Sequence, residues 1–257
     1  MLEHTYATLK NWQFESFTVH DTIKHLVSGR NPQFSNGTVP GLNFSFNVLD
    51  DPDRVTQNRT LIADIFGLTE SPVIIPRQTH SDHIGIITHE TIHNVWEDTD
   101  ALITNISHVI IGVLSADCVP VLLADPMKGV VAAIHAGWKG TAKEIVPKTI
   151  QQMQALFHSD PKDIIAGIGP SISSQCYEVG ADVAVHFRAS SKTEKDTGKS
   201  CIDLWKENET QLLQSGVPLQ NISIAGLCTY RNPDLFYSAR RDGLQTGRMA
   251  SFISLNR

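Results

Sequence analysis

The chain has 257 residues, of which 41% are hydrophobic and 19% are charged, and its formal net charge at pH 7 is -6. These values are typical of a globular protein with a sizeable core. No basic stripe is visible, which argues against nucleic acid as the main partner, and no run approaches the roughly 18 apolar residues of a membrane span.

The N-terminal segment and the cysteines indicate the compartment. Residues 1–17, MLEHTYATLKNWQFESF, lack the basic segment and apolar run of a secretory signal peptide. The four cysteines, which are widely spaced, are Cys118, Cys176, Cys201 and Cys228. This spacing favours free thiols over a disulfide framework, so we expect a cytoplasmic protein. No repeat or linker divides the chain, which predicts one domain over 1–257. Nothing in the sequence points to a particular oligomeric state.

The first predicted elements are a helix and a series of strands. An amphipathic pattern predicts a helix over 51–67, capped by Asp51 or Asp53. The segment 73–88 contains two strand-like pieces. Runs rich in Val and Ile then predict buried strands. These runs lie at 101–104, 108–118, 119–126 and 130–136.

The second half of the chain is more helical. The clearest helix is predicted over 141–157, with Thr141 as its N-cap and Pro147 as the source of a kink. The polar segment 189–200 lacks apolar periodicity and predicts a mobile surface loop. The remaining elements are a strand at 163–169, helices near 179–188 and 203–214, and strands at 222–230 and 234–238. Together these elements predict an α+β, or mixed α/β, fold.

Three segments place metal-capable side chains where predicted strands end, which is where such folds usually carry their sites. The segments are 78–80, 116–120 and 135–141. The thiolate of Cys118 and the imidazoles of His80 and His135 suit zinc or copper, and three protein ligands leave a fourth position open. Their wide spacing matches no short metal-binding motif. A hydrogen-bonded structural role for each residue is therefore the alternative.

Two segments could bind an anion. In HAGWKGT (135–141), free amides near Thr141 could act together with Lys139, although a routine strand-to-helix turn is the alternative. In YSARRDG (237–243), Arg240 and Arg241 present guanidinium groups that suit phosphate or carboxylate, and Arg248 follows soon after. A solvated basic turn is the alternative explanation of this second segment.

Several segments, taken together and in this order, carry a family resemblance. They are RQTHSDH (77–83), TDALIT (99–104), SADCVPVLLAD (115–125), AAIHAGWKGT (132–141), GIGPSISSQCYEVG (167–180) and FYSARRDGLQTGR (236–248). From about residue 40 onward the chain resembles the bacterial YfiH/YlmD family, also called the laccase-domain or polyphenol-oxidase-like family. The ADC and HAGW motifs are the most specific part. One departure is Ser81, which stands where the family usually has Gly.

The resemblance implies a fold, a metal and an activity. The fold is a layered sandwich of mixed β-sheets flanked by helices, similar to the catalytic domain of a deamidating toxin. The metal is zinc, held by His80, Cys118 and His135, which are also the implied catalytic residues; copper also suits this ligand set. The activity is phosphorolysis of adenosine, inosine or methylthioadenosine to base and ribose 1-phosphate, together with deamination of adenosine. The residues expected to bind substrate and phosphate are Lys139, Thr141, Arg240 and Arg241.

Other functions stay open. The same ligand set occurs in blue-copper sites and would suit a laccase-like polyphenol oxidase. However, reduction of oxygen to water needs several coppers held by many histidines, and the chain has no HxH pair. A cysteine hydrolase or deamidase would use Cys118 as nucleophile and His135 as base. Deamination of adenosine also needs a proton-shuttling acid, for which Glu178 is the candidate. Asp117 should point to the opposite face of the strand from Cys118.

Overall fold

The computed structural model describes residues 1–6, 9–34 and 38–257, and within them the strands form two six-stranded sheets and one three-stranded sheet. The first sheet contains, in spatial order, β1 (Leu2–Tyr6), β2 (Leu9–Gln13), β3 (Ile23–Ser28), β15 (Met249–Leu255), β7 (Ile110–Ser115) and β4 (Val73–Ile74). Its neighbouring strands are antiparallel except for β4 and β7, which are parallel.

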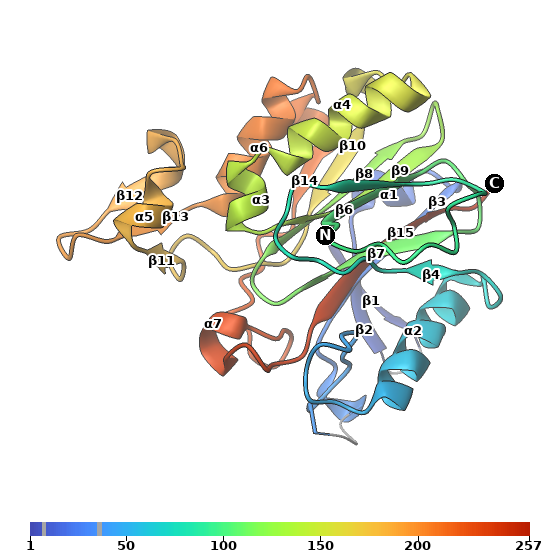
Figure 1. Cartoon of the computed structure of the whole chain (residues 1–257), viewed down its shortest axis with the longest axis horizontal. Coiled ribbons are helices and arrows are strands. Elements are labelled where there is room, and N and C mark those ends of the chain that lie inside the picture. The colour runs from blue at the N-terminus through green and yellow to red at the C-terminus, as the bar shows by residue number, and fades with distance from the viewer. Residues whose placement is uncertain (7–8, 35–37) are drawn as a thin grey trace.

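The second large sheet is also mixed. It contains, in spatial order, β14 (Ile222–Ile224), β10 (Ile165–Ile168), β8 (Val119–Asp125), β9 (Val130–Ala136), β6 (Ala101–Thr104) and β5 (Ile84–Ile87). Both edge pairs are parallel and the central pairs are antiparallel. The small sheet contains β11 (Glu178–Val179), β13 (Ser200–Ile202) and β12 (Lys192–Glu194), and it projects from the body of the molecule (Figure 1).

Helices cover the outer faces of the two large sheets. The α-helices are α1 (Glu15–Thr18), α2 (Pro52–Phe66), α3 (Trp138–Ala142), α4 (Ile145–Phe157), α5 (Ala181–Ala184), α6 (Leu204–Gln214) and α7 (Ala239–Asp242). Short 3₁₀ turns lie at η1 (Pro32–Phe34), η2 (Pro161–Asp163), η3 (Ala189–Ser191) and η4 (Leu219–Asn221). Helix α2 packs on the first sheet, and α4 and α6 pack on the second. None of the helices in the described ranges is long and apolar enough to cross a membrane.

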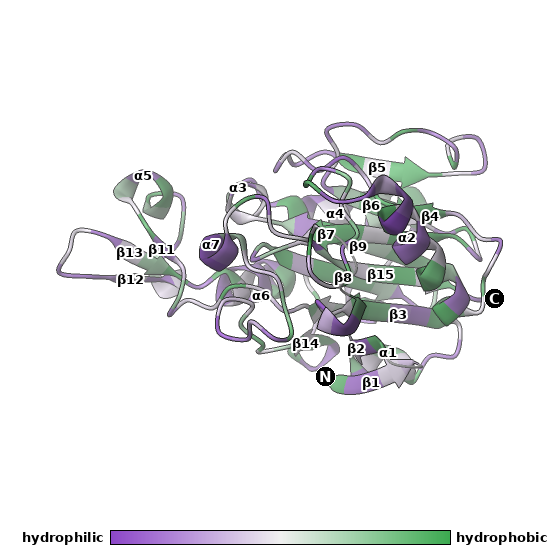
Figure 2. Ribbon diagram, turned by 90° about the horizontal axis from the view of Figure 1, so that it is seen from below, coloured by the Kyte–Doolittle hydropathy of each residue, from purple (hydrophilic) through white to green (hydrophobic). Residues whose placement is uncertain are grey.

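The layers follow from the alternation of side chains along each strand. On β7, Ile111 and Val113 pack between the two sheets, whereas Ile110 packs under α2. On β9, Ala133 points between the sheets and Ile134 points toward α4. Figure 2 shows hydrophobic residues concentrated on these inner strands and hydrophilic residues on α2 and α7. The order helix, sheet, sheet, helix confirms the predicted layered, mixed α+β fold.

Several predicted elements are confirmed. The predicted helix 51–67 is α2, whose N-cap Asp51 accepts a hydrogen bond from the amide of Asp53 at 2.9 Å, and which ends at Gly67 in the left-handed conformation. The predicted helix 203–214 is α6, capped by Asp203. The Val- and Ile-rich runs between residues 101 and 136 form β6, β7, β8 and β9, as expected.

The predicted helix 141–157 is wrong in its first turn. The chain breaks at Glu144, which has φ of 60°, and separates α3 from α4. Thr141 lies inside α3 and is not an N-cap, since its amide already donates to the Gly137 carbonyl at 2.8 Å. Pro147 produces no kink because it lies in the first turn of α4, where backbone amides have no helical acceptor.

Other corrections concern short elements. The predicted helix 179–188 is limited to α5, which follows β11, and the predicted loop 189–200 contains η3, β12 and the start of β13. The predicted strand 222–230 ends at Ile224. No strand forms over 234–238, where Phe236 and Tyr237 are buried by packing and not by a strand ladder. Strands β1, β2, β3 and β15 were not predicted from the sequence.

Candidate metal centre

His80, Cys118 and His135 come together at one end of the two-sheet sandwich. Their ligand atoms all lie within 4.8 Å of one another, and the Cys118 Sγ lies 3.7 Å from the His80 Nε2. The rings of His80 and His135 meet edge to face at 4.9 Å between centroids. Among the residues that the structure describes, this is the only group of three or more His, Cys, Asp or Glu side chains arranged to hold a metal ion.

Strand pairing explains two of the three positions. Strands β8 and β9 are antiparallel, with Pro120 paired to His135 and Val119 paired to Ala136. Cys118 directly precedes β8, so this register places it beside the end of β9, close to His135. His80 comes from the loop after β4 and has φ of 63°, a conformation uncommon for a residue with a side chain.

The buried carboxylate of Asp100 holds two of the ligands in place. It accepts hydrogen bonds from the amides of Thr79, His80 and Ser81 at 3.1, 3.1 and 2.7 Å. It also lies 2.7 Å from Nδ1 of His135. Because an ionised carboxylate only accepts hydrogen bonds, Nδ1 of His135 carries a proton, and Nε2 is therefore the nitrogen that would bind a metal.

The departure at Ser81 is compatible with this turn. The positive φ falls on His80 and not on Ser81, so the turn does not need glycine at position 81. The Ser81 hydroxyl lies 2.8 Å from the Asp100 carboxylate and 3.0 Å from the carbonyl of Asp98. The serine therefore adds a hydrogen bond to the group that orients the ligands.

The charges of the cluster are strongly coupled. Burial alone would raise the pKa of the Cys118 thiol, but the imidazoles of His135 and His80 outweigh burial and lower the pKa to about 6. Burial would lower the pKa of His135, but the Cys118 thiolate and the Asp100 carboxylate raise it to about 9. Burial would raise the pKa of Asp100, but its contacts with His135 and Ser81 lower it to about 2. A thiolate ligand is therefore available at neutral pH.

The geometry fits a transition-metal ion. With Zn–S near 2.3 Å and Zn–N near 2.0–2.1 Å, a tetrahedral site separates sulfur from nitrogen by about 3.6 Å, close to the observed 3.7 Å. Gly137 leaves the space that the ligands require. A Cβ atom there would lie 2.9 Å from Cδ2 of His80 and 3.0 Å from Sγ of Cys118. Both the donor set and this glycine agree with a metal bound by three protein ligands.

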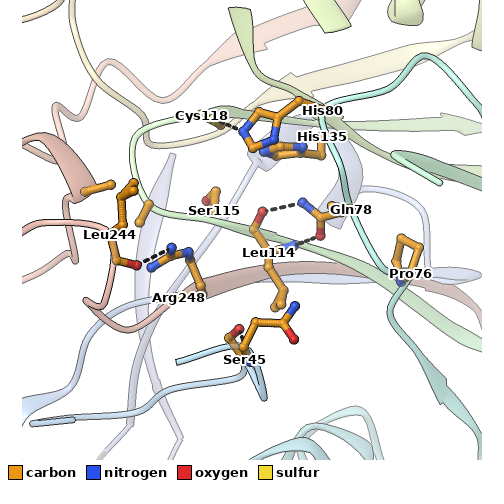
Figure 3. A pocket seen from close by; sticks show the side chains of 13 residues that line it. Ser45, Pro76, Gln78, His80, Leu114, Ser115, Cys118, His135, Leu244 and Arg248 are labelled. Carbon is orange, nitrogen blue, oxygen red and sulfur yellow. Dashed lines mark hydrogen bonds between the residues drawn. The ribbon is translucent and has the colours of Figure 1, made fainter. Parts of the chain in front are cut away.

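A pocket opens directly onto the three ligands (Figure 3). Its volume is about 230 Å³, and besides the ligands it is lined by Ser45, Asn47, Pro76, Gln78, Leu114, Ser115, Ala116, Ala239, Leu244 and Arg248. Gln78 fixes the wall, because its side chain donates to the Leu114 carbonyl at 2.8 Å and accepts from the Leu114 amide at 2.7 Å. Arg248 is the cationic side chain of this lining.

Arg248 lies within electrostatic reach of the metal ligands. Burial lowers the pKa of its guanidinium, and the negative charges of Cys118 and Asp117 act against that change. The guanidinium donates to the carbonyls of Leu244 and Gly247 at 2.9 and 3.2 Å and to that of Thr246. The guanidinium is thus held at the mouth of the pocket by its own loop.

The predicted phosphate-binding residues do not gather in this pocket. Thr141 is buried, and its hydroxyl donates to the Ala136 carbonyl at 3.1 Å, so neither its amide nor its hydroxyl is free. Lys139 is exposed, with its ammonium 5.7 Å from the centre of the Trp138 ring, and it does not line the pocket.

The two adjacent arginines have structural partners. Arg240 donates from Nη1 to the Glu178 carbonyl at 3.0 Å and stacks over Tyr177 at 5.2 Å. Arg241 uses Nε, Nη1 and Nη2 in five hydrogen bonds. The acceptors are the carbonyls of Thr229, Tyr230 and Phe236 and the carboxylate of Asp242. Since a guanidinium has five N–H groups, this argues against a phosphate role for Arg241.

The candidate acid Glu178 also lies outside the pocket, as does Asp117. The Glu178 carboxylate pairs with Lys195 and Lys199 at 3.1 and 3.0 Å, on the projecting small sheet. Asp117 does not join the ligand cluster, as predicted. Its carboxylate accepts hydrogen bonds from Thr229, Ser238 and the Arg240 amide, which anchors the C-terminal segment to the start of β8.

Asp100, which contacts His80 and His135, was not singled out from the sequence. It lies within the TDALIT segment, but an isolated aspartate before a strand carries no motif of its own. The sequence offered one signal for Asp100, namely that it is a carboxylate, because a metal-bound histidine usually donates its second N–H to a carboxylate or carbonyl. Arg248 was noted in the sequence but was not assigned to the site.

Comparison with known proteins gives a consistent set of relatives. Residues 24–256 match the family model described as multi-copper polyphenol oxidoreductase laccase. A Bacteroides thetaiotaomicron protein named purine nucleoside phosphorylase is 36% identical over 262 residues, covering 95% of this chain and 96% of the relative. Purine nucleoside phosphorylase YlmD of Bacillus subtilis is 36% identical, covering 90% and 89%. Adenosine deaminase RL5, from an unknown prokaryotic organism, is 34% identical, covering 91% and 92%.

Solved structures share the fold over nearly the whole chain. The crystal structure of YlmD from Geobacillus stearothermophilus matches with a TM-score of 0.89 and 27% identity, covering 99% of each chain. The crystal structure of YfiH from Bacillus licheniformis matches with a TM-score of 0.84 and 31% identity, covering 91% of this chain and 93% of that one.

Proposed function

The chain is an enzyme of the multi-copper polyphenol oxidoreductase laccase family, which includes the YfiH and YlmD proteins, and we propose that it is a zinc-dependent purine nucleoside enzyme. Its main reaction is the phosphorolysis of adenosine, inosine or methylthioadenosine. One observation carries this proposal: a single pocket holds the three-ligand cluster and a guanidinium, so one cavity offers both a metal and an anion partner. The names of the relatives point to the same substrate class.

The metal would be held by His80, Cys118 and His135, with Asp100 fixing the tautomer of His135. When bound, it would polarise a substrate oxygen or lower the pKa of a water molecule. Copper suits the same donor set, so the metal has to be identified by analysis. The chain itself contributes a thiolate, two oriented imidazoles and the space above them at Gly137.

In phosphorolysis, a phosphate oxygen forms a bond to C1′ of the ribose while the bond from C1′ to the purine nitrogen breaks. The base leaves with the bonding electron pair and takes up a proton. The chain must therefore hold phosphate and ribose in contact and exclude water. Arg248 is the cation placed for phosphate, in the role first predicted for Thr141 and Arg241. Lys139 and Arg240 stay proposals for substrate binding at the rim.

Deamination of adenosine is the second candidate, favoured by the similarity to the adenosine deaminase relative. It requires water to attack C6, a proton to reach the leaving amine and ammonia to depart. No Asp or Glu is among the pocket-lining residues of the described chain, and the nearby Asp100 lies behind His135. We therefore propose that deamination is slower than phosphorolysis in this chain.

The other functions fit less well. A laccase needs several coppers, and the described residues offer one three-ligand cluster. Cys118, His135 and Asp100 could serve as the nucleophile, base and orienting carboxylate of a cysteine hydrolase, because Asp100 orients the imidazole next to the thiolate. A thiolate bound to a metal is not a free nucleophile, so metal content separates these two proposals.

The test is a product analysis. Zinc-loaded protein is incubated with adenosine, with and without inorganic phosphate, and the products are separated by chromatography. We expect adenine and ribose 1-phosphate only when phosphate is present, and a smaller yield of inosine in both samples. The variant Asp64→Asn, at an exposed position on α2, serves as a folded control. No product from the loaded wild type in either sample would overturn the proposal.

A further inference from the structure

A second hollow adjoins the metal pocket. Ser45, Asn47, Pro76 and Leu114 line both cavities. Figure 3 shows the Leu114 side chain pointing away from His80 and toward Ser45. The side-chain amide of Gln78 hydrogen-bonds to the backbone of Leu114. Leu114 therefore has a fixed position where the two cavities meet. A molecule bound at the metal ligands can therefore extend past Leu114 into the second hollow.

Part of the lining of this hollow is apolar and exposed to solvent. Phe46 is 49% exposed and Val95 is 74% exposed, and both line the hollow. Ile75, which is half-buried, also lines the hollow. Exposed apolar groups that face a concavity gain free energy when a ligand covers them, roughly in proportion to the area removed from water. This part of the lining is therefore suited to an apolar ligand group.

The two arginines of the hollow already have protein partners. Arg77 donates from Nη1 to Glu97 at 2.8 Å. Arg59 donates from Nε and Nη2 to the Phe44 carbonyl at 3.1 and 2.8 Å, and its guanidinium lies 4.4 Å above the centre of the Phe46 ring. Burial lowers the pKa of Arg59 to about 10. Arg59 is therefore fixed against Phe46, and the charge of Arg77 is paired with that of Glu97, so the uncharged surface that the hollow offers is that of Phe46 and Val95.

From this geometry, and resting on the proposed function, we propose that the second hollow is a substrate subsite for an uncharged apolar substituent on the purine nucleoside. Phe46 and Val95 are its specificity-determining residues. The reacting bond would lie at the metal ligands and the substituent would pass over Leu114. The subsite is separate from the metal ligands and from Arg248, so its loss should alter substrate choice more than metal binding.

The probes are adenosines that carry an n-butyl or a methyl group, either as a 5′-thioether or on N6. A fully buried methylene changes an equilibrium constant by roughly fourfold. For three extra methylenes in a half-open hollow, we expect kcat/KM of the butyl compound to exceed that of the methyl compound by about tenfold. The preference for butyl over methyl should occur either in the 5′-thioether series or in the N6 series, whichever places its substituent in the hollow. Adenosine 5′-phosphate tests the alternative of an anionic substituent.

Two variants test the apolar part of the lining. Phe46→Ala should reduce the butyl-to-methyl ratio of kcat/KM to about 2, and Val95→Ala should reduce it by a smaller factor. Val19→Ala is the control matched to Val95→Ala, because both variants remove two methyl groups from an exposed valine. Val19 is 75% exposed and lies at the end of α1. The ratio for Val19→Ala should equal that of the wild type. Zinc content, measured on the same samples, should not change in any of the three variants.

Equal kcat/KM for butyl and methyl compounds in both series, with adenosine turned over normally, would overturn the subsite and leave the proposed function intact. A higher kcat/KM for the 5′-phosphate than for either butyl compound would show that the hollow prefers an anion, which would also overturn the subsite. Absence of adenosine turnover by the loaded wild type would overturn the proposed function, and the subsite with it.

Discussion

At the scale of single residues, Asp100 connects two of the three chain segments of the candidate metal centre. Its side chain holds the loop of His80 and the ring of His135, and its backbone carbonyl accepts a hydrogen bond from the His135 amide at 2.7 Å. Two of the three ligands therefore depend on one buried carboxylate. Cys118 depends instead on the register of β8 and β9.

Replacing Asp100 with Asn tests this role. The amide is nearly isosteric but replaces one acceptor oxygen with a donor, so it cannot accept all the hydrogen bonds of the carboxylate. We expect zinc affinity to fall by about 10- to 100-fold, as is usual for the outer partner of a metal-bound histidine. Competition with a chelator measures the affinity. Unchanged affinity in Asp100→Asn, with Asp64→Asn as the exposed control, would show that Asp100 has no part in metal binding.

Gly137→Ala tests the space above the ligands. The added Cβ would lie within 3.0 Å of both His80 and Cys118, so at least one ligand must move. We expect weaker zinc binding, by about tenfold or more, with little loss of stability, because the backbone φ of Gly137 is -64° and suits alanine. Gly180→Ala is the control, since its Cβ would meet only the side chain of Asp182, which can turn away. Wild-type affinity in Gly137→Ala would contradict this role.

The site could be predicted in part from the sequence. His80, Cys118 and His135 were singled out by residue type and by family resemblance, and the structure brings them together. Thr141 and Arg241 were also of a suitable type, but their donors are used within the fold, which no sequence pattern reveals. Whether a donor is free depends on tertiary contacts, and these join residues far apart in the chain.

At the scale of elements, the C-terminal segment around α7 forms one side of the pocket. Arg241 and Arg248, two arginines of this segment, have different roles. Arg241 ties the segment to the carbonyls of Thr229, Tyr230 and Phe236, while Arg248 faces the pocket. Asp117 fixes the same segment to the start of β8. Arg241 and Asp117 thus stabilise the segment that carries Arg248, while the guanidinium of Arg248 is held by the carbonyls of its own loop.

Alanine variants should distinguish the structural role of Arg241 from the phosphate-binding role proposed for Arg248. Arg241→Ala leaves backbone carbonyls without their donor and should lower the free energy of unfolding by about 2–4 kcal/mol, with the KM for phosphate little changed. Arg248→Ala should raise the KM for phosphate at least tenfold with zinc content unchanged. Denaturant unfolding and phosphate-dependent kinetics measure these effects, with the exposed Arg231→Ala as control. A tenfold rise in the KM for phosphate in Arg241→Ala alone would reverse the assignment.

The elements could be predicted best where a local signal is strong. Helix α2 has both an aspartate cap and a glycine stop, and the central strands are long Val- and Ile-rich runs. The break at Glu144 could not be predicted, because a left-handed glutamate has no sequence signature. Strand β15 was missed although it has seven buried residues, since its partners β3 and β7 are distant in the chain.

At the scale of the whole molecule, one buried histidine links stability to pH. His25 in β3 is 2% exposed, and its Nε2 accepts a hydrogen bond from the Phe14 amide at 2.7 Å. Burial, together with the charge of His4, lowers the pKa of His25 from 6.5 to about 3. The folded imidazole is therefore neutral and cannot take up a proton without losing this hydrogen bond.

This depressed pKa predicts acid sensitivity. The unfolded chain binds a proton at His25 below pH 6.5 and the folded chain does not until about pH 3, so the stability present above pH 6.5 is lost as the pH falls. Between pH 6.5 and 4.5 the free energy of unfolding should fall by about 1.4 kcal/mol per pH unit from this group. His25→Gln keeps an acceptor for Phe14 and should remove that part of the slope. An equal slope in both proteins would contradict the assignment.

The proposed requirement for nucleoside cleavage is one metal ion held by His80, Cys118 and His135. It is tested most directly by measuring metal content and phosphate-dependent adenosine cleavage on the same samples of wild type and Cys118→Ala. We predict about one zinc ion per chain and active enzyme for the wild type, and loss of both in the variant. Full metal occupancy in Cys118→Ala, or full activity without metal, would contradict the account.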